Sequence, residues 1–407
     1  MTVDCYFAVR KRTTCRSSGY FHDMHRIRIP STVTVVSVTL LLNACATATP
    51  VGARPGATAG APATDVSSPA QPVATRWPVK TAEHIDLWLH AFAMLTSDSA
   101  DAAPIPLYRL GYRDSLIVVR NRVNILSSLD ANRVVLTTGL AASSGYLQAQ
   151  FLPLDMANWD VVRAFAERFL LYEGDPRRAP DKATAARVMQ FASIFPSAPD
   201  REWLRLFVAA VSDEQLRFFA DEHARAVRGR AAVITAVDSL WQRVYRAKFD
   251  RFLTNTGQRT GDMVLSLPIG GEGRAGVGRD GQTVVVVPFP SRISDAVEAI
   301  FVFAHEVTGS LVATVVADNS TPAELRAGTA GRLVSVGQVR AGAMLLERVA
   351  PELLDGYMRF YIAQSRGRVE EASSPTARSA AFARRFELSV TIRDALQRQI
   401  EIVLGGI

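Results

Sequence analysis

The chain has 407 residues, of which 48% are hydrophobic and 21% are charged, so it is long and apolar enough to bury a sizeable core. Residues 1–44 hold six Lys or Arg and two Asp, which leaves 40 basic and 37 acidic residues, a net charge of +3, for the remainder. That remainder has no dense basic run, so we expect no nucleic-acid partner. The three cysteines are Cys5, Cys15 and Cys45, so no disulfide or thiolate metal site can form from residues after 45.

The N-terminal residues have the pattern of a secretory leader. Arg26 and Arg28 precede the mostly apolar run STVTVVSVTLLL, which is too short to span a bilayer, and a small residue and a cysteine follow. The sequence Leu42-Asn43-Ala44-Cys45 resembles the lipobox of bacterial lipoproteins. The resemblance implies that residues 1–44 are a signal peptide, for which Met24 is a second candidate start. The alternative is an ordinary signal peptide that happens to end near a cysteine.

The lipoprotein resemblance also implies where the protein is located. Lipidation of Cys45 would anchor the chain to a membrane of the cell envelope, because several acyl chains give stable anchoring. Ala46 after the cysteine favours the outer membrane, with the folded part facing the periplasm. Residues 45–79 are rich in Ala, Thr, Pro, Gly and Ser and bury too little apolar surface to fold. They are predicted to be a disordered tether.

Residues 80–255 are predicted to form a helical lobe. The segment TAEHIDLWLHAFAML has Thr81 as a candidate cap and an apolar face with helical spacing. A second helix is predicted to begin at an Asn158 cap and to end by Gly174. Further apolar repeats with helical spacing continue to about residue 253, separated by short polar turns.

Residues 256–407 are predicted to form a second lobe that contains a small sheet. Strands near 262–267 and 283–288 are expected to pair as a β-hairpin, with Asp280-Gly281 as its turn. A central buried helix should run from Ser294 to about Ala317. The fold class is therefore mainly α, of the α+β type, with a small β-hairpin before a central buried helix.

The chain after the central helix is also predicted to be helical. Thr321-Pro322-Ala323-Glu324 is a capping box with proline at the first helical position, and it should open a helix that reaches about Val349. Another helix is expected to start at Pro351, and a last one should end near Gly405.

The glycine-rich segment between the two predicted strands contains a formal GxGxxG at Gly271–Gly276. A dinucleotide site needs these glycines to open a helix that follows a strand. Here a second strand follows instead, so this segment is interpreted as a flexible hairpin tip or flap.

His305 and Glu306 lie side by side in the apolar run FVFAHEVTGSLV. Ionisable groups are costly to bury without a partner, a metal or a chemical role. A strand, a short break and a helix that carries AHE resemble the active-site segment of zincin metallopeptidases. In that family the edge strand aligns an extended substrate, and the helix carries HExxH. The resemblance implies that His305 is a zinc ligand and that Glu306 is the general base.

The chain departs from this pattern at Gly309, which stands where the motif has its second histidine. Residues 305 and 309 lie on one face of a helix, so the glycine should leave a gap beside His305. Glu347 is the candidate third ligand, because Glu324 is better explained as part of the capping box. His90 and His223 are the remaining candidates for an imported ligand.

A structural explanation of the pair stays open at this stage. His305 and Glu306 could satisfy a polar network inside a buried helix, with Arg340 or Arg348 as the partner of Glu306. A membrane-spanning interpretation of residues 299–317 is disfavoured by two adjacent ionisable groups near its centre.

These patterns lead to one functional expectation and two alternatives. The expected protein is a membrane-anchored envelope lipoprotein with a zincin-like, degenerate metal site, which acts in binding, scaffolding or envelope maintenance with an envelope protein or peptide as partner. One alternative is a zinc-dependent peptidase with an atypical ligand set, in which case zinc is the cofactor. The other is a purely structural helical lipoprotein unrelated to zincins.

The lipobox gives a direct test. Replacing Cys45→Ser should abolish incorporation of a labelled fatty acid and leave unprocessed precursor, because the serine hydroxyl cannot supply the thioether. Radiolabelling and electrophoresis of the membrane fraction would measure both effects. A Cys15→Ser variant is the matched control and should label normally; normal lipid labelling of Cys45→Ser would refute the assignment.

Overall fold

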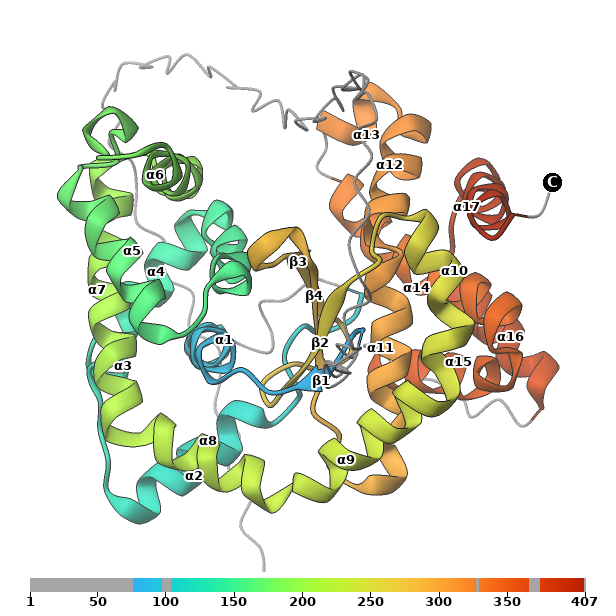
Figure 1. Ribbon diagram of the computed structural model, residues 1–407, viewed down its shortest axis with the longest axis horizontal. Helices are drawn as coiled ribbons and strands as arrows, with labels where there is room; N and C mark the ends of the chain where they lie inside the picture. The colour runs from blue at the N-terminus through green and yellow to red at the C-terminus, as the bar shows by residue number, and fades with distance from the viewer. Residues whose placement is uncertain (1–75, 97–103, 327–328, 366–373, 406–407) are drawn as a thin grey trace, which may run out of the picture. The chain divides into compact units, whose positions relative to one another are not determined.

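The computed structural model describes residues 76–96, 104–326, 329–365 and 374–405, all within one compact unit, Gln71–Ile407. The expected signal peptide, Cys45 and most of the expected tether lie outside the described residues. The described part is mainly helical and contains one small mixed sheet, which confirms the predicted fold class (Figure 1).

The sheet has four strands in the order β1-β2-β4-β3, which are Val79–Lys80, Gly261–Ser266, Thr283–Pro288 and Arg274–Val277. β1, β2 and β4 run parallel, and β3 is the antiparallel edge strand beside β4. The last residues of the expected tether are therefore folded: Trp77 is only 2% exposed, and Val79 pairs with Met263.

The predicted pairing of the two apolar strands was wrong. Strands lie close to the expected residues, but β2 and β4 run parallel, and the hairpin is formed by β3 and β4. The physical reason is that β2 and β4 are buried on both faces, as is typical of parallel strands covered by helices on both sides. The glycine-rich segment, predicted to be a flap, supplies β3. Its turn to β4 contains Asp280 and Gly281 with φ of 63° and 74°.

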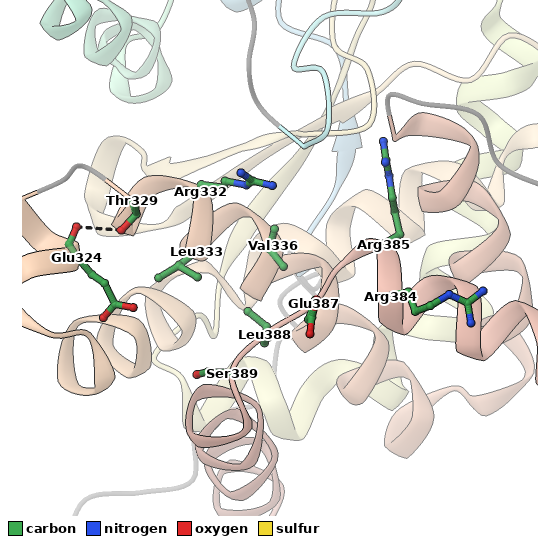
Figure 2. A pocket seen from close by; sticks show the side chains of 10 residues that line it. All are labelled: Glu324, Thr329, Arg332, Leu333, Val336, Arg384, Arg385, Glu387, Leu388 and Ser389. Atoms are coloured by element: carbon green, nitrogen blue, oxygen red, sulfur yellow. Dashed lines mark hydrogen bonds between the residues drawn. The ribbon is translucent and has the colours of Figure 1, made fainter.

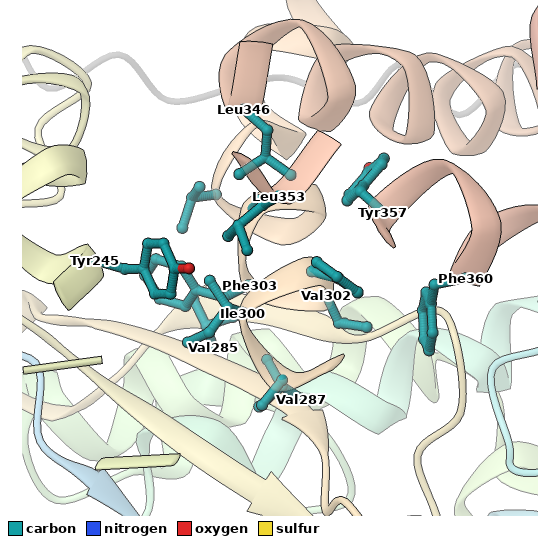
Figure 3. Close-up of a cluster of buried hydrophobic side chains, with 14 of the residues drawn as sticks. Tyr245, Val285, Val287, Ile300, Val302, Phe303, Leu346, Leu353, Tyr357 and Phe360 are labelled. Carbon is teal, nitrogen blue, oxygen red and sulfur yellow. The ribbon is translucent and has the colours of Figure 1, made fainter. Parts of the chain in front are cut away.

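Helices cover both faces of the sheet. On one face, Val264, Val284 and Val286 pack against Ile85 and Leu89 of α1 (Glu83–Leu95). On the other face, alternate residues of the same strands belong to the cluster that contains α11 (Val297–Val307). Side chains from β4, α11, α14 (Ala330–Val349) and α15 (Leu354–Gln364) meet in this cluster (Figure 3).

The helices between α1 and β2 divide between two cores: those up to Phe219 build a second core together with α1, and those after residue 230 join the core on the sheet. They are α2 (Tyr112–Val123), α3 (Ser128–Ala131), α4 (Arg133–Ala142), the 3-10 segment η1 (Ser144–Asp155), α5 (Trp159–Leu171), α6 (Lys182–Ile194), α7 (Ala198–Glu214), the π segment η3 (Gln215–Phe219), α8 (Ala220–Gly229), α9 (Ala231–Leu240), the π segment η4 (Trp241–Tyr245) and α10 (Arg246–Asn255). Short 3-10 turns lie at Pro176–Arg178 in this part of the chain, at Arg279–Gly281 between β3 and β4, and at Ile293–Asp295 before α11.

Two of the predicted helix starts can be compared with the structure. The Asn158 side chain accepts from the amide of Val161 and caps α5, as predicted. Thr81 is not the cap of α1, because Ala82 occupies that position and no side chain caps the helix. The core cluster on the sheet also includes Trp241 and Phe249, so the helices α9 and α10 pack with the elements that follow residue 256.

The predicted helix from Ser294 to Ala317 is two helices, α11 and α12 (Gly309–Asn319), bent by 41° at Thr308. The Thr308 hydroxyl donates to the carbonyl of His305 at 2.7 Å, a local bond that competes with regular helix geometry. Among the described residues no single helix has the length and apolarity to cross a bilayer, and this bent pair meets those criteria only when its halves are joined.

The C-terminal helices begin as predicted but are more divided. The Thr321 hydroxyl accepts from the amide of Glu324, whose carboxylate accepts from the amide of Thr321, so the capping box is confirmed. The helix it opens, α13 (Pro322–Arg326), is short, and α14 follows separately. The 3-10 turn Pro351–Leu353 leads into α15, and α16 (Pro375–Arg385) and α17 (Val390–Val403) complete the described chain.

Phe303 lies at the centre of the main core and gives a test of this packing. Its ring contacts Trp77, Trp241 and Phe249 at centroid distances of 5.1, 4.6 and 5.9 Å. We expect Phe303→Ala to lower the free energy of unfolding by about 3–5 kcal/mol, through lost burial and the cavity left behind. Urea unfolding would measure it. Val277→Ala, at a residue that is 70% exposed, is the control, and equal stability of the two variants would contradict the packing.

Candidate functional site

His305 and Glu306 lie on α11, which sits against β4 and faces the sheet. Both side chains are buried, at 0% and 6% exposure, as the apolar run predicted. The partners that compensate their burial therefore have to come from neighbouring elements.

Glu306 is held by the start of the edge strand. Its Oε1 accepts a hydrogen bond from the amide of Gly273 at 3.0 Å and lies 2.9 Å from Nδ1 of His305. A side chain at residue 273 would not fit, because a Cβ there would lie 2.8 Å from Cγ of Glu306 and 2.5 Å from the carbonyl oxygen of Val286. The glycine thus allows the strand backbone to reach the carboxylate.

The His305 ring stacks on Tyr361 of α15, with ring centroids 5.5 Å apart and planes inclined by 22°. Tyr361 donates its hydroxyl to the carbonyl of Gly271, and Tyr357 donates to the carbonyl of Val339. Burial raises the pKa of both tyrosines well above the ordinary value of 10.0, so they remain neutral donors. Nε2 of His305 is buried and has no hydrogen-bond partner within the described part of the chain.

The gap expected beside His305 at Gly309 is filled. A Cβ on Gly309 would lie 2.9 Å from Nε2 of Gln338, a side chain of α14. Gly309 also lies beyond the bend at Thr308, so residues 305 and 309 do not share one continuous helical face. The expectation of a hollow at this position was wrong, because a neighbouring helix supplies a side chain that the local sequence lacks.

The other candidate ligands do not join His305. Glu347 is exposed on α14, and Glu324 is engaged in its capping box. His90 and His223 bond to carboxylates elsewhere. No group of three or more His, Cys, Asp or Glu that could hold a metal ion occurs in the part of the chain that the structure describes.

A metal would need the free Nε2 of His305 together with two or more further donors. The donor set around the pair does not provide them, so it does not fit a zinc site.

The arginines considered as partners of Glu306 are engaged elsewhere. The guanidinium of Arg340 lies over the ring of Phe382, 5.5 Å from its centroid, and Arg348 pairs with Glu401. The partners of Glu306 that the structure does show are a backbone amide and the adjacent imidazole. Glu306 is therefore part of a polar network, but its partners are the amide of Gly273 and the imidazole of His305 and not the expected Arg340 or Arg348.

η1 packs against β3 on the face of the sheet that α1 covers, where Leu154 joins Ile85, Val264 and Val284. Two side-chain nitrogens of Arg274 donate to the Gln150 oxygen, at 3.1 and 2.9 Å. A Cβ on Gly276 would lie 2.8 Å from Cδ1 of Leu154, so the missing side chain permits close approach of η1. η1 therefore covers the face of the edge strand that is opposite to the His305–Glu306 pair.

A second buried polar cluster escaped the sequence interpretation. Asp86 and His90 are one turn apart on α1, and both are 0% exposed. Nε2 of His223 lies 3.1 Å from Oδ2 of Asp86, and Nε2 of His90 lies 3.0 Å from Oε1 of Glu214. The acid of α1, Asp86, thus pairs with His223, and the histidine of α1, His90, pairs with Glu214. The i, i+4 spacing of Asp86 and His90 on an apolar helix face is the signal that could have indicated it.

The geometry of this cluster depends on the π segment Gln215–Phe219. Nine residues of regular α-helix turn through about 900°, which would place residues 214 and 223 on opposite faces. The wider π turn reduces that rotation, so both can face α1. Burial alone would raise the pKa of Glu214, but the hydrogen bond from His90 and the charges of His90 and Arg120 outweigh it and lower the pKa. This cluster joins α1 to α7 and α8.

Comparison of the chain with protein-family models, with curated proteins and with solved structures returned no match.

The contacts of Glu306 predict an asymmetry between two substitutions. Glu306→Ala leaves the amide of Gly273 buried without its acceptor and should cost about 1–3 kcal/mol of stability. Glu306→Gln keeps an acceptor oxygen in the same place and should cost less. Denaturant unfolding of both variants measures the difference. A Glu306→Ala protein as stable as the wild type would show that the carboxylate does not serve the fold.

Proposed function

We propose that the chain is a lipid-anchored protein of the cell envelope with a zincin-like body and a degenerate metal site, which acts by binding or scaffolding rather than by hydrolysis. The observation that carries the proposal is the closure of the His305–Glu306 pair by internal contacts. The amide of Gly273 and the ring of Tyr361 contact the pair, and the side chain of Gln338 fills the space beside Gly309.

The arrangement of strands and helix supports the zincin-like part of the proposal. The antiparallel edge strand β3 precedes β4, and the helix with the His-Glu pair follows β4 and packs on it. A purely helical lipoprotein would not need a hairpin packed alongside α11. This order of strands and helix supports a zincin-like architecture only, because architecture does not determine activity.

The chemistry of the pair supports a non-hydrolytic role. A general base must reach the proton that it removes, directly or through one water. The Oε1 atom of Glu306 is already engaged with a strand amide and with Nδ1 of His305, and the side chain is 6% exposed.

A zinc-dependent peptidase is the second candidate, and one observation favours it. Nε2 of His305 has no hydrogen-bond partner among the residues that the structure describes, and it is the type of atom that binds zinc. The lack of further donors among the described residues weighs against this candidate.

Zinc binding separates the two candidates. We expect the purified full-length protein, incubated with zinc and dialysed, to retain much less than one equivalent by elemental analysis, and His305→Ala to leave that amount unchanged. Thermal melting of both proteins would verify that they are folded. Stoichiometric zinc that disappears in His305→Ala would overturn the non-hydrolytic proposal and revive the peptidase.

A further inference from the structure

A pocket of about 550 Å³ lies between α14 and the segment that joins α16 to α17 (Figure 2). Three arginines line it: Arg332 projects from the first turn of α14, and Arg384 and Arg385 are the last residues of α16. All three are exposed. The pocket is distant in sequence from the His305–Glu306 pair and shares none of its residues.

The three guanidinium groups are unpaired, unlike those of nearby arginines. Within the described residues none of them takes part in an ion pair or a hydrogen bond. By contrast, Arg378 on the same helix α16 pairs with Asp355, and Arg348 on α14 pairs with Glu401. The pocket thus gathers three guanidinium groups that have no ion-pair partner in the part of the chain that the structure describes.

The acidic residues at the pocket only partly offset this charge. Glu324 also lines it, but its carboxylate accepts from the amide and the hydroxyl of Thr321. Glu387 is the second acidic residue of the lining. Three guanidinium groups against two carboxylates leave the lining with a net positive charge.

Two long helices also begin at this pocket. The N-cap residues of α14 and α17, Thr329 and Ser389, are part of the lining. Helix N-termini carry partial positive charge and amide groups without partners inside the helix. These partial charges add to the positive electrostatic potential of the three arginines, whose full charges are the larger contribution.

We propose that this pocket binds a phosphate-bearing ligand, either a soluble organic phosphate or the headgroup of an anionic lipid. Guanidinium groups match the oxygens of phosphate through paired hydrogen bonds, and several together suit a doubly charged group. The volume lies in the range of about 300–1,000 Å³ of small-molecule sites and exceeds that of bare phosphate. Leu333, Val336 and Leu388 give the organic part an apolar wall. This inference does not depend on the proposed function.

Calorimetric titration of the full-length protein in non-ionic detergent micelles tests the proposal. One arm uses glycerol 3-phosphate, and the other compares dihexanoyl phosphatidic acid with dihexanoyl phosphatidylcholine. We expect saturable binding of a phosphate probe that weakens at least about tenfold in the triple variant Arg332→Ala, Arg384→Ala, Arg385→Ala. Binding of phosphatidic acid alone identifies a lipid headgroup, and binding of glycerol 3-phosphate alone identifies a soluble ligand.

Two controls keep the test specific. Arg398→Ala removes an exposed arginine of α17 outside the pocket and should leave the affinity unchanged. Glu387→Gln removes a repelling carboxylate and should tighten binding. Thermal melts of all variants report whether they are folded. Absence of saturable binding by both probes, or equal affinity of the triple variant and wild type, would overturn the proposal.

Discussion

The structure depends on one constraint: α11 is buried between the sheet and several surrounding helices while it carries two ionisable side chains. Charged or polar groups placed in such a core require hydrogen-bond partners, and unpaired groups cost several kcal/mol. The fold meets this requirement for Glu306 by bringing the backbone of Gly273 within 3.0 Å of its carboxylate. The fold satisfies only one of the two ring nitrogens of His305, because Nε2 has no hydrogen-bond partner among the described residues.

Glycine makes the arrangement sterically feasible. At Gly273 and Gly276 the edge strand approaches Glu306 on one side and Leu154 on the other, at distances that exclude a Cβ. Gly342 plays a similar part on α14, because a Cβ there would lie 2.2 Å from the Tyr357 hydroxyl. Close backbone approach thus joins the sheet, the central helix and the tyrosines beneath His305 into one packed unit, and it leaves little room for a substrate at the pair.

The protein has two buried polar clusters, and different groups supply the hydrogen bonds in each. The His305–Glu306 pair uses a backbone amide and an aromatic face. The Asp86–His223 and His90–Glu214 pairs use side chains only: α1 contributes one acid and one histidine, α7 contributes Glu214 and α8 contributes His223. The arginines of the pocket near α17 differ from both, since they are exposed and have no ion-pair partner among the residues that the structure describes. Exposed, unneutralised charge is available to a ligand, whereas a satisfied buried pair is not, and this difference motivates the binding proposal.

The sequence by itself determined the helical class, the Asn158 cap, the Thr321–Glu324 capping box and the inward orientation of His305 and Glu306. These depend on local spacing and on the cost of exposing an apolar run, which are properties of neighbouring residues. Only the tertiary structure decided that β2 and β4 run parallel, that Gln338 fills the space beside Gly309 and that η1 covers β3. Each of these depends on contacts between residues far apart in the chain, and local patterns carry no information about which distant side chain arrives.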